Sequence, residues 1–111
     1  MSLDYMKESL GRVNEKALEF KLVNHVASGS GYIRAKVLLD GEDVTEKSVM
    51  KIGTQEARKL KRDMFVTSYY GDSVLFTIRN DEPIAHGLHK VRVLCDVEML
   101  GSYSAEFEGT I

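Results

Sequence analysis

His89–Ile111 reads HKVRVLCDVEMLGSYSAEFEGTI, and this stretch decides the fold. From His89 to Met99 the side chains alternate between a mostly apolar face and a mostly charged face, which is the period of a half-buried strand. The pattern breaks at Leu100-Gly101-Ser102 and then resumes from Tyr103 to Ile111. Two alternating runs joined by a short glycine-containing loop predict a β-hairpin.

Upstream of this hairpin, further segments have the composition and alternation of strands. They are 17–26, 32–39, 46–52, 65–73 and 74–79, of which 46–52 and 65–73 carry the weaker patterns. Turn residues separate several of them, most clearly Asp40-Gly41 and the run that ends at Pro83. Short strands at this spacing predict an all-β fold, an antiparallel β-sandwich of about six to eight strands.

One connection of the sandwich is expected to hold a short helix, over 54–64. Thr54 is a suitable N-cap, and Leu60 and Met64 stand four residues apart, as on one face of a helix. Basic residues near its C-terminal end would favour the helix dipole. The polar segment at the start of the chain, residues 1–14, is expected to be either a short helix or a loose N-terminal arm.

Length and composition limit the class of protein. The chain has 111 residues, which suits a single domain with one ordinary core. Its 17 acidic and 15 basic residues leave a formal net charge of −2, so no basic surface is expected to attract nucleic acid or an anionic membrane. No apolar run approaches the roughly 20 residues that span a bilayer, and the first residues lack a signal-peptide pattern.

The single cysteine, Cys95, lies on the apolar face of the strongest predicted strand. An internal disulfide is therefore impossible, and we expect a small buried hydrophobic residue rather than a nucleophile. The lack of a disulfide framework favours a cytoplasmic location.

His86 and His89 form the sequence HGLH, the one conspicuous group of metal-ligating residue types. Two histidines three residues apart share one face of a helix. Here Gly87 and the strand that follows favour an extended chain, in which the two side chains diverge. Zinc sites use three or four protein ligands, and no third ligand stands at a recognisable spacing. We therefore predict no metal site and no cofactor.

Tyr69 and Tyr70 stand side by side before the turn residues Gly71-Asp72. Successive side chains of a strand face opposite ways, so one of the two rings is expected to be exposed. Together with Tyr103, these tyrosines are candidates for a surface that contacts a protein or a sugar. No nucleophile–base arrangement stands out in the sequence, so no residue is predicted to be catalytic.

Two short motifs carry a resemblance to a known family. The first is G-x-H-x-V-x-V, matched by Gly87, His89, Val91 and Val93, which opens the long strand near the C-terminus. The second is D-G-x-x-V, matched by Asp40, Gly41 and Val44 after an early strand. With these motifs, residues 18–111 resemble the small β subunit of bacterial C-glycoside deglycosidases and its relatives.

The resemblance implies a specific role. Such a subunit is a β-sandwich that docks on a larger subunit with a sugar-isomerase-like barrel, and the barrel carries the metal and the acid and base residues of a lyase. His86 and His89 would then be strand-entry or interface residues. The residues themselves leave open a stand-alone carbohydrate-binding module, self-association through an edge strand and, with least support, an enzyme in its own right.

Overall fold

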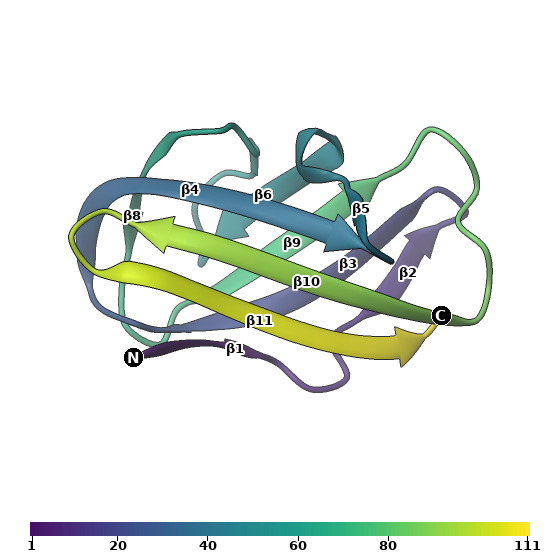
Figure 1. Cartoon of the computed structure of the whole chain (residues 1–111), viewed down its shortest axis with the longest axis horizontal. Helices are drawn as coiled ribbons and strands as arrows, with labels where there is room; N and C mark the ends of the chain where they lie inside the picture. Colours follow the sequence, from purple (N-terminus) through teal and green to yellow (C-terminus); the bar gives the residue numbers. More distant parts are fainter.

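Two antiparallel sheets pack face to face in the computed structural model, which describes residues 1–111 (Figure 1). Six strands make up sheet A, in the order β1 (Ser2–Tyr5), β3 (Ala17–His25), β9 (Ser73–Arg79), β6 (Ser48–Ile52) and β7 (Arg58–Lys59), with β2 (Gly11–Asn14) also paired to β3. Sheet B has the order β11 (Gly101–Thr110), β10 (Leu88–Val97), β4 (Gly29–Leu39) and β5 (Glu42–Asp43), with β8 (Met64–Ser68) also paired to β4. The predicted all-β antiparallel sandwich is confirmed.

The C-terminal hairpin forms as predicted, from β10 and β11. Val91 pairs with Phe107, Val93 with Ala105 and Cys95 with Tyr103. The side chains of Val91, Val93, Ala105 and Phe107 are all buried between the sheets. Since β10 also pairs with β4 along its other edge, β10 lies inside sheet B and β11 is an edge strand of that sheet.

An aromatic cluster joins the two sheets. Phe20 of β3 stacks on Phe76 of β9, with ring centroids 5.2 Å apart, and meets the ring of Phe107 of β11 edge-on at 5.0 Å. Phe107 in turn stacks on Tyr5 of β1 at 3.9 Å. Phe20 and Phe76 come from sheet A and Phe107 from sheet B, so the cluster fixes how the sheets sit on one another.

The first fourteen residues do not form a loose arm or a helix. Ser2–Tyr5 is β1, which pairs with β3 in the register Ser2–His25 to Tyr5–Leu22. Gly11–Asn14 is β2, which pairs with the start of β3. Tyr5 accounts for the difference, because its ring is held against Phe107 and so brings the polar segment onto the sandwich.

The helix expected over 54–64 is also absent. The segment forms a turn, the two-residue strand β7 and the start of β8, and the one helical turn of the chain, η1 (Thr45–Lys47), lies in the connection from β5 to β6. Gln55 donates a hydrogen bond to the Thr67 carbonyl oxygen at 2.7 Å, and Arg58 donates one to the Phe65 carbonyl oxygen at 2.8 Å. These two side chains satisfy carbonyl oxygens of the edge strand β8, which is one of the ways in which sheet edges are protected.

The sandwich has two distinct ends (Figure 1). The hairpin end carries the turns 26–28, 69–72 and 98–100, together with the N-terminus. The histidine end carries the turn at Asp40-Gly41, the loop 80–87 and the C-terminus. No helix of this fold has the length and apolarity needed to cross a bilayer.

Candidate functional site

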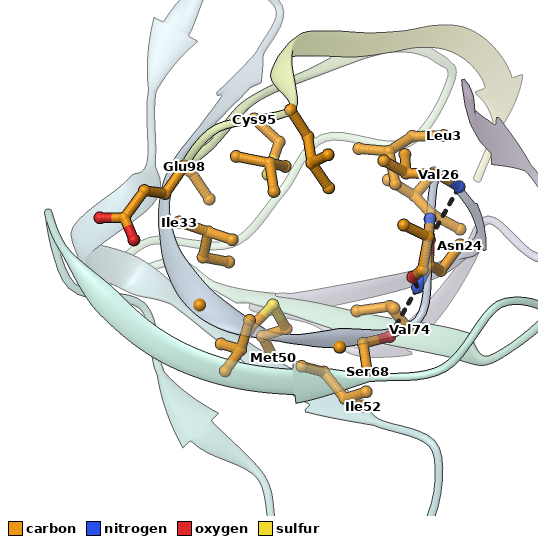
Figure 2. A pocket seen from close by; sticks show the side chains of 18 of the residues that line it. Leu3, Asn24, Val26, Ile33, Met50, Ile52, Ser68, Val74, Cys95 and Glu98 are labelled. Atoms are coloured by element: carbon orange, nitrogen blue, oxygen red, sulfur yellow. Dashed lines mark hydrogen bonds between the residues drawn. The ribbon is translucent and has the colours of Figure 1, made fainter. Parts of the chain in front are cut away.

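A cavity of about 220 Å³ lies between the two sheets at the hairpin end (Figure 2). Twenty-two residues line it, and 15 of these are hydrophobic. Sheet A contributes Ile52 and Val74, which pair with each other across β6 and β9. Sheet B contributes Ile33 and Cys95.

The cavity exists because small residues occupy the inward positions of sheet B at this end. The inward face of β4 reads Gly29, Gly31, Ile33, Ala35, Val37 and Leu39, by alternation with the exposed Tyr32, Arg34 and Lys36. Ala35 pairs with Cys95, another small side chain. A Cβ added at Gly31 would meet no atom within 4 Å. Toward the histidine end, the larger Val37 and Leu39 fill the same face.

Polar side chains in the lining are already bonded within the protein. Asn24 Nδ2 donates to the Ala27 carbonyl oxygen and to Ser68 Oγ, both at 2.9 Å, and Asn24 Oδ1 accepts from the Val26 N–H at 2.9 Å (Figure 2). Ser28 Oγ accepts from the Tyr70 N–H at 2.8 Å. These groups hold the turns at the hairpin end, so the interior of the cavity is left with an apolar character.

Cys95 adds no charge to the cavity. Burial raises the pKa of its thiol to about 11, and the nearby Asp96 carboxylate acts in the same direction. At neutral pH the thiol is therefore protonated, and it acts as the small hydrophobic residue expected from the sequence rather than as a nucleophile.

The mouth of the cavity lies between β4 and the β10–β11 turn. Pairing of β10 with β4 stops at Val97 and Ile33, and beyond that point the Glu98 N–H donates to the Tyr32 carbonyl oxygen at 3.0 Å. The edge of β4 from Gly29 to Gly31 thus has no strand beside it on the β10 side, although β8 pairs with it on the other side. Glu98 and Leu100, which also line the cavity, are exposed.

Large apolar side chains are exposed around the same end. We call them the apolar rim: Tyr32, Phe65, Tyr69, Tyr70, Met99 and Leu100. Tyr69 and Tyr70 are 60% and 63% exposed, and Met99 is 96% exposed. The rings of Tyr32 and Phe65 meet edge-on at 5.2 Å on the outer face of sheet B.

Three of the five candidate residues from the sequence come together at this end. Both Tyr69 and Tyr70 are exposed, rather than one of them, because they lie in the turn after β8 and not within a strand. Tyr103 is half-buried on β11, and its hydroxyl donates to the Leu100 carbonyl oxygen at 2.6 Å. Sequence reasoning missed Tyr32, whose outward position in the alternation of β4 was the available signal.

The other two candidates, His86 and His89, lie at the histidine end. His86 is exposed, whereas His89 is 9% exposed, with Nδ1 2.5 Å from Asp40 Oδ2 and Nε2 2.6 Å from the Ala85 carbonyl oxygen. Nowhere in the chain do three or more His, Cys, Asp or Glu side chains gather as metal ligands. The five candidates therefore do not form one site.

The His89–Asp40 contact fixes charge at the histidine end. Burial lowers the pKa of His89, but hydrogen bonds to the Ala85 carbonyl and the Asp40 carboxylate outweigh it, so the pKa lies above its ordinary value of 6.5. For Asp40, burial raises the pKa, but the hydrogen bonds from the Lys90 N–H and from His89 outweigh it, so the pKa lies below its ordinary value of 3.8. The pair is consequently an imidazolium and a carboxylate near pH 6.

No family model matches the sequence, and no curated protein is similar to it. Solved structures with a TM-score of 0.50 share the fold at low identity. A conjugative transposon lipoprotein from Bacteroides eggerthii is 12% identical, with 96% of this chain and 93% of that chain covered and a TM-score of 0.50. A conjugate transposon protein from Bacteroides vulgatus is 8% identical, with 96% and 81% covered and the same TM-score of 0.50. The periplasmic stator complex FlaF and FlaG of the archaellum from Sulfolobus acidocaldarius is 12% identical, with 96% and 89% covered and a TM-score of 0.42.

Proposed function

We propose that the protein is a non-catalytic accessory subunit of a C-glycoside deglycosidase-like complex in the cytoplasm. It docks through the apolar rim on a larger subunit with a sugar-isomerase-like barrel, and the lyase chemistry belongs to that larger subunit. The rim is the observation that carries the proposal. Exposed aromatic and methionine side chains gathered at one end of a small domain are typical of a protein-binding surface.

The identity of the partner rests on the sequence resemblance. Its two motifs meet in the fold, because Asp40 of D-G-x-x-V contacts His89 of G-x-H-x-V-x-V at 2.5 Å. This contact gives both motifs a structural reason to occur in one chain. It also supports strand entry as the role of His89, since His89 is the second residue of β10.

Coexpression with the barrel subunit of a C-glycoside deglycosidase tests the proposal. We expect the two chains to coelute and cleavage of a C-glycoside to need both. Met99→Asp and Tyr70→Asp should weaken the complex by about tenfold or more, since burying an unpaired carboxylate in an interface costs more than ~1.4 kcal/mol. Leu88→Asp is the matched control, because Leu88 is 65% exposed at the histidine end. Equal loss in all three variants, or no complex, would contradict the proposal.

A stand-alone carbohydrate-binding module is the alternative proposal, favoured by the exposure of both Tyr69 and Tyr70. Exposed rings stack on the apolar face of sugars. Titration of the isolated protein with glycosides, followed by tyrosine fluorescence, separates the two proposals. Saturable binding that is lost in Tyr69→Ala and Tyr70→Ala supports the module. Light scattering on the same sample detects self-association.

A further inference from the structure

We infer that the cavity at the hairpin end is a binding site for a small neutral amphiphile. The apolar body of the ligand fills the space between the sheets, and its hydroxyl end lies at the mouth. The inference does not depend on any partner protein, since the cavity lies within this chain.

The size of the cavity sets the size of the apolar body. An apolar cavity of about 150 Å³ in a protein core takes up benzene. The cavity here, at about 220 Å³, therefore accommodates a body larger than benzene, such as a chain of about eight carbons. Close packing is the norm in protein interiors, so an apolar hollow of this size between the two sheets is a feature that a ligand can fill.

The lining sets the chemistry of that body. Asn24, Ser28 and Ser68 already hydrogen-bond within the protein, and the Cys95 thiol is uncharged at neutral pH because burial keeps its pKa high. A charged or strongly polar group placed among Ile52 and Val74 would lose its water without gaining a partner. Only an apolar body is favoured there.

The mouth sets the chemistry of the polar end. Backbone groups along Gly29 to Gly31 have no strand beside them on the β10 side, and a hydroxyl can both donate to and accept from such groups. Glu98 is exposed at the same mouth, and its carboxylate disfavours a ligand with a negative charge. A neutral alcohol is therefore preferred over a carboxylate with the same chain.

The test compares 1-octanol with octanoate at pH 7, on the isolated full chain. Calorimetry and thermal unfolding should show binding of 1-octanol with a rise in Tm, because a ligand that binds only the folded state stabilises it. Octanoate should bind at least about tenfold more weakly. Gly31→Leu places a side chain in the cavity and should abolish binding of 1-octanol. Gly11→Leu is the matched control, since Gly11 is also a strand glycine with no atom within 4 Å of an added Cβ.

Methyl NMR on the unmodified protein keeps the test decisive if Gly31→Leu does not fold. Addition of 1-octanol should shift the methyl signals of Ile33, Ile52 and Val74, which line the cavity. The methyl signals of Ile78 and Val91, which do not line it, should stay unchanged. The inference is overturned if 1-octanol does not bind at millimolar concentration, if Gly31→Leu binds it as well as Gly11→Leu does, or if the shifted methyl groups lie outside the cavity.

Discussion

His89 is a buried histidine whose two ring nitrogens are both engaged. A carbonyl oxygen only accepts, so Nε2 must carry a proton to bond to the Ala85 carbonyl, and Nδ1–H donates a hydrogen bond to the Asp40 carboxylate. Asp40 itself is held by a second contact, since its Oδ1 accepts from the Lys90 N–H at 2.8 Å. The contacts join the Asp40-Gly41 turn to the start of β10, and so they close the histidine end of sheet B.

This pair makes stability depend on pH. The pKa of His89 is raised in the folded state, so its stabilising effect is fully present below the unfolded value of about 6.5 and is lost as pH rises through the folded pKa. The lowered pKa of Asp40 contributes stability above about pH 4, which is lost as pH falls through the folded value. Between these limits the pair contributes fully.

We expect the free energy of unfolding of the unmodified protein to fall as pH rises from 6 to 9. His89→Gln should remove most of this slope and cost about 1.5 kcal/mol at pH 6, the value of a hydrogen bond to a charged group. Urea denaturation at several pH values measures both. Asp4→Asn is the control, because it removes the exposed contact of Asp4 with His25 and should preserve the slope. A slope that persists in His89→Gln would show that another group causes it.

At the scale of elements, periodicity identified the longer strands and the five-residue β6, and it missed the strands of two to four residues, β1, β2, β5 and β7. The alternation from His89 to Ile111 predicted β10 and β11 correctly because one face of each is buried against sheet A. The pattern at Leu60 and Met64 also fits a helix, but both residues enter the core from non-helical backbone, Leu60 directly after β7 and Met64 at the start of β8. Local pattern cannot show that Gln55 and Arg58 are needed on the edge of β8, because that need arises only once the sheet exists.

β1 shows the same effect at the start of the chain. Its sequence is short and largely polar. It is held by its pairing with β3 and by the ring of Tyr5, which stacks on Phe107 at 3.9 Å. Tyr5→Ala should lower the free energy of unfolding by about 2 kcal/mol, less than for a fully buried ring. Val13→Ala in the neighbouring β2 is the control, since Val13 is 50% exposed and should cost less than ~0.5 kcal/mol. Equal stability of the two variants in urea denaturation would mean that β1 is dispensable.

At the scale of the whole molecule, the sandwich was predictable and the cavity was not. Seven alternating or apolar runs with turns between them have few other ways to bury their faces. The cavity depends on which inward-facing residues have small side chains. The sequence did not show this at residues 28–31, because their composition is that of a turn. In the fold Gly29 begins β4, because β8 pairs with it from the other side. That pairing places Gly29 and Gly31 on an inward face, where the missing side chains leave space.

The molecule is thus closely packed at its centre and hollow at one end, and the two regions should respond differently to substitution. Phe20 has no exposed surface and contacts rings of both sheets. Phe20→Ala would open a new void where the neighbours cannot collapse, at a cost of about 3 to 5 kcal/mol. Gly31→Leu instead fills existing space and should leave the stability equal or higher, since Gly31 is not held in a left-handed conformation. Chemical denaturation followed by both circular dichroism and tyrosine fluorescence measures the two variants on one scale. A loss below ~1 kcal/mol in Phe20→Ala would contradict close packing at the centre. A larger loss in Gly31→Leu than in Phe20→Ala would place the void elsewhere than between Gly31 and the opposite sheet.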